Sequence, residues 1–138
     1  MRILVTGANG QLGNEMQVLA KENPQHTYYF TDVQELDICN KDAVWAYIAE
    51  KRIELIVNCA AYTAVDKAED DSELAYKLNS EAPKTLACAA QFNGAAMIQV
   101  STDYVFDGTA HIPYTEECDP CPNSVRSEER RVGKECRS

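Results

Sequence analysis

The chain alternates short apolar runs with longer stretches in which apolar residues recur every three or four positions. Four runs are rich in β-branched, aromatic and other apolar residues and predict strands: Ile3–Val5, Tyr28–Thr31, Leu55–Val57 and Ala96–Val100. A fifth, Leu36-Asp37-Ile38, predicts a short extended piece. The unbroken apolar character of the third run is typical of a parallel strand that is covered on both faces.

Helical spacing fills the intervals between these runs. Asn40 is a candidate cap for a helix that extends to about Lys51, and a longer helix begins at Asp71 or Ser72 and is interrupted or bent near Pro83. The first helix places four apolar residues on one face, which are Leu12, Met16, Leu19 and Ala20. The alternation predicts an α/β fold, a Rossmann-type doubly wound parallel sheet that is incomplete and holds only its first strands and helices.

A glycine-rich loop joins the first strand to the first helix. Its spacing is G-x-x-G-x-x-G, with Gly7 at the tight turn, Gly10 where backbone can approach a pyrophosphate, and Gly13 where the helix packs closely. The start of the helix offers free N–H groups to phosphates, so Gln11 and Leu12 are candidate contacts as well. A glycine pattern alone is weak evidence, but its position after a strand and before a helix predicts a dinucleotide-binding loop.

Asp32 follows the second strand and lies 19 residues after Gly13. An acidic residue about 20 residues beyond such a loop is the expected partner of the adenosine ribose hydroxyls. The alternative is an ordinary turn aspartate. No Lys or Arg lies near Asp32 to hold a 2′-phosphate, so NAD(H) is preferred over NADP(H), although both stay open.

Composition narrows the class of protein. The 138 residues are 45% apolar, enough for one core, and the formal net charge of −9 argues against a nucleic-acid partner. There is neither a leader segment nor an apolar run of 18 residues, so we expect a cytoplasmic protein that does not enter membranes. Cys118 and Cys121 form a C-x-x-C, but no second ligand pair accompanies them, so no metal site is expected.

Several stretches resemble the dTDP-4-dehydrorhamnose reductases of the extended short-chain dehydrogenase/reductase superfamily. The resemblance covers about residues 1–124, and its most specific elements are V-D-K-A-E and S-T-D-Y-V-F-x-G. The matching stretches are Asp37-Ile38, residues 58–69, Leu78-Asn79-Ser80, residues 101–108 and residues 112–116.

The resemblance implies NAD(P)H-dependent reduction of the 4-keto group of dTDP-4-dehydro-L-rhamnose to dTDP-L-rhamnose, for cell-surface polysaccharide. A hydroxyl at Thr102 could donate a hydrogen bond to the oxygen that becomes negative during hydride transfer, and Asp103 would join it in contacting the nucleotide sugar. The family also leaves room for a homodimer of the longer parent protein. The cofactor contacts that it adds are Asp37, Ile38, Ala60, Ala61, Tyr62, Thr63 and Asn79.

The family's Tyr-x-x-x-Lys pair, the general acid and its lysine, has no counterpart here. No tyrosine follows Tyr114, and Arg130 stands four residues before Lys134. Charge also reverses, from an excess of acids in residues 1–124 to five Lys and Arg against three Asp and Glu in residues 125–138. We therefore expect residues 1–124 to be the first part of a Rossmann domain, residues 125–138 to be a disordered and unrelated tail, and the fragment to be inactive.

Two other functions stay open at this stage. One is a nucleotide-sugar epimerase or dehydratase of the same superfamily, which relies on the same Tyr-x-x-x-Lys pair. The other is a non-catalytic dinucleotide-binding subunit that resembles the regulatory β subunit of methionine adenosyltransferase.

Overall fold

The computed structural model describes residues 1–61, 72–101, 106–115, 117–118 and 121. Four strands form one parallel sheet in the order β2-β1-β3-β4. Because β1 has β2 on one side and β3 on the other, the strand order reverses at β1, which is where sheets of this kind bind ligands. The strands are β1 (Arg2–Thr6), β2 (Thr27–Thr31), β3 (Leu55–Asn58) and β4 (Ala96–Gln99).

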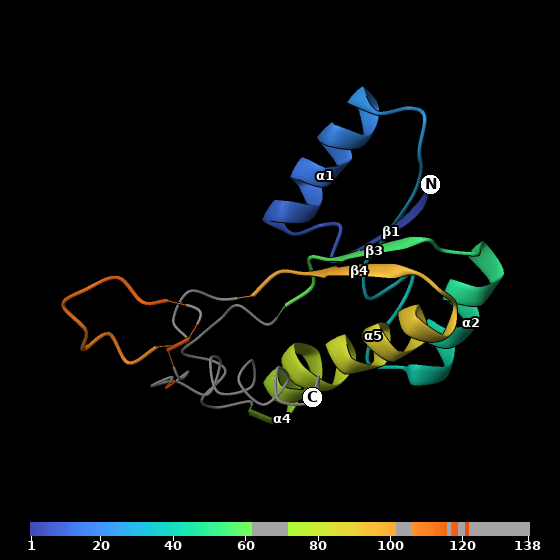
Figure 1. Ribbon diagram of the computed structural model, residues 1–138. Helices are drawn as coiled ribbons and strands as arrows, with labels where there is room; N and C mark the ends of the chain where they lie inside the picture. The colour runs from blue at the N-terminus through green and yellow to red at the C-terminus, as the bar shows by residue number, and fades with distance from the viewer. Residues whose placement is uncertain (62–71, 102–105, 116, 119–120, 122–138) are drawn as a thin grey trace.

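Helices lie on both faces of this sheet (Figure 1). The helix α1 lies on one face, and α2 and α5 pack together on the other. This arrangement confirms the Rossmann-type α/β fold that the sequence predicts. The helical elements are α1 (Gln11–Glu22), α2 (Lys41–Lys51), α4 (Ser72–Tyr76), the π-helical turn η1 (Lys77–Glu81) and α5 (Ala82–Phe92).

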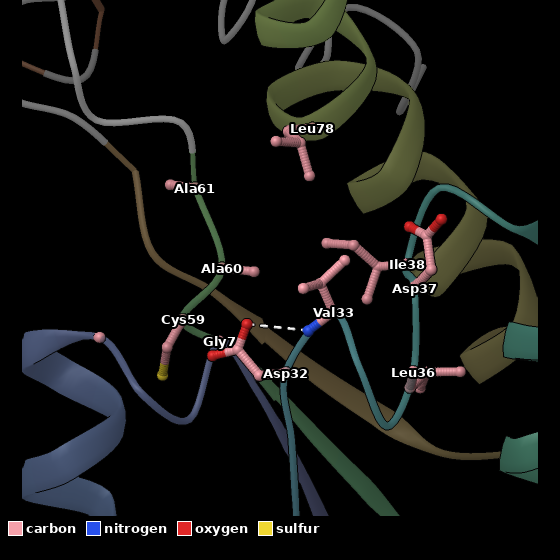
Figure 2. Close-up of a pocket in the computed structure, with 11 residues that line it drawn as sticks. Gly7, Asp32, Val33, Leu36, Asp37, Ile38, Cys59, Ala60, Ala61 and Leu78 are labelled. Carbon is pink, nitrogen blue, oxygen red and sulfur yellow. Dashed lines mark hydrogen bonds between the residues drawn. The ribbon is translucent and has the colours of Figure 1, made fainter.

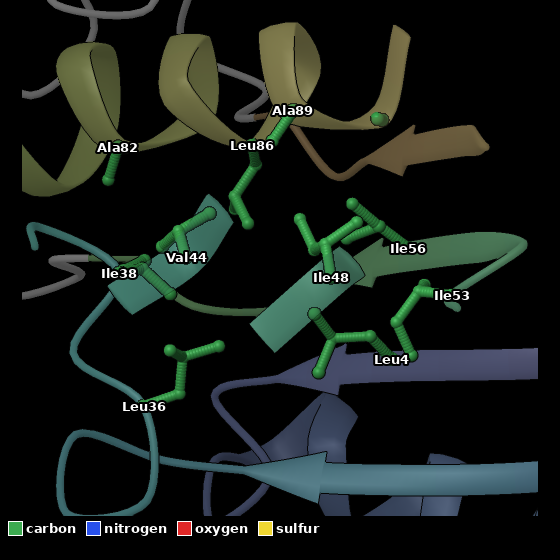
Figure 3. Packing of buried hydrophobic residues seen from close by; sticks show 11 residues of the cluster. Leu4, Leu36, Ile38, Val44, Ile48, Ile53, Ile56, Ala82, Leu86 and Ala89 are labelled. Atoms are coloured by element: carbon green, nitrogen blue, oxygen red, sulfur yellow. The ribbon is translucent and has the colours of Figure 1, made fainter. Parts of the chain in front are cut away.

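The main core fills the space between the sheet and the pair α2 and α5 (Figure 3). Leu4 and Ile56 come from neighbouring strands, and Val44, Ile48 and Leu86 meet them from the helices, all five without exposed surface. The predicted cap of α2 is present, since the Asn40 side chain accepts a hydrogen bond of 3.1 Å from the Ala43 N–H. Burial of these side chains stabilises α2 and α5 against the sheet.

The face that α1 covers has a smaller core of Ile3, Val5 and Val57. The predicted apolar face of α1 is only partly buried there: Leu12 and Leu19 remain 42% and 45% exposed. Periodicity predicted the helix correctly, but within the part of the chain that the structure describes little covers its apolar side.

The predicted extended piece at Leu36-Asp37-Ile38 does not form a strand of the sheet. Leu36 and Asp37 connect a turn at residues 33–35 to a turn at Ile38 and Cys39, and the Asp37 carboxylate accepts a hydrogen bond of 2.9 Å from the Cys39 N–H. Leu36 and Ile38 are each only 5% exposed, because this connection places both side chains in the main core. Alternating apolar and polar residues can therefore arise from an irregular connection as well as from a strand.

The predicted interruption near Pro83 takes the form of η1, which ends immediately before α5. Pro83 has no N–H to donate and so fits the first turn of α5. The boundary at residues 124 and 125 lies outside the described residues. Among the residues that are described, no helix has the length and apolar character needed to span a membrane.

Candidate dinucleotide-binding site

The glycine loop is shaped by close backbone contacts. Gly7 has a φ of +66°, in the left-handed region that favours glycine, and a Cβ there would lie 2.6 Å from the Ala60 nitrogen. A Cβ on Gly13 would lie 2.3 Å from the Gly7 carbonyl oxygen. Both glycines are thus required by the fold itself, because the atoms they would meet are backbone.

Gly10 differs from these two glycines. A Cβ on Gly10 would lie 3.3 Å from the Gly7 carbonyl oxygen, a tight contact but far less severe than those at Gly7 and Gly13. Gly10 is also the N-cap of α1, and no side chain caps the helix or places an acid in its first turn. The first N–H groups of a helix have no intrahelical acceptor and carry partial positive charge, so this end of α1 can accept an anion.

Asp32 stands directly after the last residue of β2 and faces the loop. One carboxylate oxygen accepts a hydrogen bond of 3.0 Å from the Asn9 N–H, and the other accepts one of 2.8 Å from the Val33 N–H. The Asp32 N–H in turn donates to Glu35 at 2.9 Å. The carboxylate is therefore held at the edge of the loop in a partly exposed position, which a ribose hydroxyl could reach.

A cavity of about 270 Å³ opens between the loop, the end of β3 and the start of the long helical region. Figure 2 shows Leu78 facing Ile38 and Val33 across this space, with Ala60 and Ala61 forming another side. The walls are thus apolar at one end and carry Asp32 and the glycine loop at the other. The lining residues are Gly7, Gly10, Asp32, Val33, Leu36, Asp37, Ile38, Cys59, Ala60, Ala61 and Leu78.

Cys59 brings a thiol to this cavity. Partial burial raises the pKa of Cys59 above its ordinary value of 9.0, so the thiol is neutral at physiological pH. A neutral side chain adds no repulsion toward a bound phosphate.

Seven of the predicted cofactor contacts line the cavity. These are Gly7, Gly10, Asp32, Asp37, Ile38, Ala60 and Ala61. Four others do not: Gln11 and Leu12 lie exposed in the first turn of α1, Gly13 packs against the loop, and Asn79 is buried in η1. Tyr62, Thr63, Thr102 and Asp103 lie outside the described residues.

Four lining residues were not predicted as contacts, namely Val33, Leu36, Cys59 and Leu78. The sequence did carry a signal for Val33, because an apolar residue in a turn beside the expected ribose contact is more suited to contact a ligand than to join the core. In the structure Val33 is 68% exposed. Leu78 lies in the Leu78-Asn79-Ser80 stretch that resembles the family, but that resemblance assigned the cofactor contact to Asn79, and only the tertiary packing shows that Leu78 lines the cavity.

Comparison with known proteins agrees with this geometry. The family model described as "RmlD substrate binding domain" matches residues 1–136. The curated relative "Probable dTDP-4,6-dihydroxy-2-methyloxan-3-one 4-ketoreductase" of Streptomyces antibioticus is 41% identical over 136 residues, which are 98% of this chain and 46% of the relative. The chain thus spans about half the length of this relative.

Two solved structures extend the comparison. A dTDP-4-dehydrorhamnose reductase of Clostridium acetobutylicum superposes with a TM-score of 0.93 at 48% identity, over 98% of this chain and 48% of that one. The dTDP-4-dehydrorhamnose reductase of Bacillus anthracis, solved in complex with NADP, superposes with a TM-score of 0.90 at 38% identity, over 97% and 48% of the two chains. By the family-model match, and as its motifs predict, the chain belongs to the RmlD substrate binding domain family.

Proposed function

We propose that this chain forms the adenosine-binding side of the NAD(P)H site of a reductase that converts dTDP-4-dehydro-L-rhamnose to dTDP-L-rhamnose. The observation that carries the proposal is that one cavity contains the glycine loop, Asp32 and an apolar slot at the carboxyl ends of β1, β2 and β3. The family of the chain and the names of its structural neighbours supply the reaction.

Each part of the cavity suits one part of a dinucleotide. The backbone at Gly10 leaves room that a side chain would fill, and the uncapped start of α1 faces the same loop, so the pyrophosphate would bind there. Asp32 would accept hydrogen bonds from the ribose hydroxyls. Ile38 and Leu78 would hold the adenine ring between apolar surfaces, with Asp37 at its edge.

The cofactor, when bound, supplies the hydride for the 4-keto carbon of the sugar. The chain's own contribution at that step would come from Thr102, whose hydroxyl would donate a hydrogen bond to the developing oxyanion. Asp103 would contact the nucleotide sugar beside it. Tyr62 and Thr63 complete the cofactor contacts that we propose from the family motifs.

The lining residues favour NADH over NADPH. No Lys or Arg is among the described residues that line the cavity, whereas Asp32 and Asp37 both carry negative charge there. A 2′-phosphate near Asp32 would be repelled, while a free 2′-hydroxyl could donate to the carboxylate. The bound NADP in the Bacillus anthracis relative shows that the phosphorylated cofactor is accommodated in this family.

A second candidate substrate is a different dTDP-linked 4-ketosugar. The Streptomyces antibioticus relative, a probable 4-ketoreductase of another dTDP sugar, matches this chain at 41% identity. The cavity described above would bind the cofactor in the same way for either sugar.

The direct test is turnover by the full protein that contains this chain. NADH and NADPH oxidation would be followed at 340 nm with dTDP-4-dehydro-L-rhamnose and with the dTDP-4,6-dihydroxy-2-methyloxan-3-one for which the Streptomyces antibioticus relative is named. The proposal predicts faster reduction of the rhamnose precursor. Faster reduction of the second sugar would support the alternative substrate, and reduction of neither would contradict both.

A further inference from the structure

Every strand of the sheet ends on a side chain that can form hydrogen bonds. Thr31, Thr6, Asn58 and Gln99 are the last residues of β2, β1, β3 and β4, and they pair with one another in register across the sheet. These four side chains, which we call the polar row, therefore lie on one face of the sheet, the face that α2 and α5 cover. Apolar residues would fit such a place equally well, so the polarity needs an explanation.

Asn58 is the centre of the polar row and has no exposed surface. Its side-chain oxygen accepts a hydrogen bond from the Thr6 hydroxyl and a second one, of 3.3 Å, from the Ala60 N–H. Its side-chain nitrogen donates to the Gln99 oxygen at 2.7 Å. Gln99 then donates to the Val100 carbonyl at 2.8 Å, so the bonds run in one direction from β1 to the exit of β4.

Three residues of the polar row stand just before residues that line the cavity. Gly7 follows Thr6, Asp32 follows Thr31, and Cys59 to Ala61 follow Asn58. The contact that matters most joins Ala60 and Gly7, whose backbones approach so closely that a Cβ on Gly7 would lie 2.6 Å from the Ala60 nitrogen. Because the two backbones are in such close contact, a displacement of Ala60 would change the shape of the cavity or displace the loop.

We propose that Asn58 is a positioning residue for the dinucleotide site, and that through Thr6, Ala60 and Gln99 it fixes the chain after β3 against the glycine loop. This inference rests on the proposed function. It adds a residue that would touch neither cofactor nor substrate, yet would control how well the cavity accepts the cofactor.

The test compares cofactor affinity with stability in matched variants. Asn58→Leu removes all three hydrogen bonds, and Thr6→Val removes one hydroxyl at nearly constant shape, whereas Thr6→Ser retains it. Ile56→Ala is the control, because Ile56 is equally buried two residues earlier on the same strand and contacts the core instead of the site. NADH affinity would be measured by titration calorimetry, and unfolding midpoints in urea would be measured beside it.

We expect Asn58→Leu and Thr6→Val to raise the NADH dissociation constant by about tenfold, which is about 1.4 kcal/mol of binding free energy. Thr6→Ser and Ile56→Ala should remain within about twofold of the wild type, even where Ile56→Ala loses more stability. Equal effects of Asn58→Leu and Ile56→Ala on affinity would overturn the inference, since they would show a purely structural role.

A measurement without ligand separates this inference from the proposed function. Amide hydrogen exchange at Ala60 should become faster in Asn58→Leu and stay unchanged in Ile56→Ala, because only the first variant loses the acceptor of that N–H. Unchanged exchange in Asn58→Leu would overturn the positioning role. If the wild-type chain bound no dinucleotide, the proposed function would fail while the exchange comparison still decided whether Asn58 holds this segment.

Discussion

At the scale of single residues, the three glycines of the loop have different reasons to be glycine. A Cβ on Gly7 or Gly13 would lie less than 3.0 Å from backbone atoms, whereas a Cβ on Gly10 would lie 3.3 Å from the Gly7 carbonyl oxygen, a tight but less severe contact. Sequence spacing predicted all three positions, since the strand and helix on either side fix where the turn must lie. Sequence spacing could not predict which of the three positions tolerates a side chain least, because the atoms that a Cβ on Gly7 would meet include those of Ala60, more than fifty residues later.

This difference predicts opposite results for two alanine variants. Gly13→Ala should lower the free energy of unfolding, because strain against backbone, about 1–3 kcal/mol, exceeds the gain in helix propensity of at most about 1 kcal/mol. Gly10→Ala should change stability by less than about 1 kcal/mol and yet weaken NADH binding. Urea unfolding and calorimetry on both variants would check this, and a Gly10→Ala protein with unchanged affinity would contradict the proposed location of the pyrophosphate.

Cys59 supplies a second test at the same scale. Because burial raises its pKa, the folded state favours the neutral thiol. The stability that this shift contributes is therefore present below the ordinary pKa of 9.0 and is lost as the pH rises above it. Iodoacetamide labelling of Cys59, followed by peptide mass spectrometry, should be slow at pH 7, faster above pH 9 and slowed further by NADH. Labelling that NADH does not affect would argue against cofactor binding beside Cys59.

At the scale of elements, local signals were sufficient where an element has its own start and stop residues. Asn40 capped α2 as its position predicted, and β1, β2 and β3 lie where short apolar runs are bounded by polar residues. The connection at Leu36-Asp37-Ile38 was predicted as an extended piece because Leu36 and Ile38 both enter the core, and alternation alone does not distinguish a strand from an irregular connection.

The cap of α2 gives the prediction at this scale. Asn40→Ala removes the acceptor of the Ala43 N–H and should lower the free energy of unfolding by about 1 kcal/mol. The neighbouring variant Lys41→Ala is the control, since Lys41 is exposed and makes no cap bond. Urea denaturation of both variants would check the cap, and equal midpoints for Asn40→Ala and the wild type would show that the bond contributes nothing.

At the scale of the whole molecule, the sheet order explains why distant segments share one site. Placing β1 between β2 and β3 brings the loop after β1, Asp32 after β2 and Ala60 after β3 to the same edge. The α/β alternation was enough to predict this meeting point. The side of the cavity that Leu78 forms depends on how η1 lies relative to the turn at Ile38. The periodicity of apolar residues in the sequence does not predict that arrangement.

The central claim is that this edge binds the adenosine side of a nicotinamide dinucleotide, and titration calorimetry of NADH into the purified chain tests it most directly. The account predicts saturable binding at one site, weaker binding by Asp32→Ala because the ribose hydroxyls lose their acceptor, and loss of binding in Gly10→Val because its side chain occupies the pyrophosphate position. A folded Gly10→Val protein that binds NADH as tightly as the wild type would contradict the account.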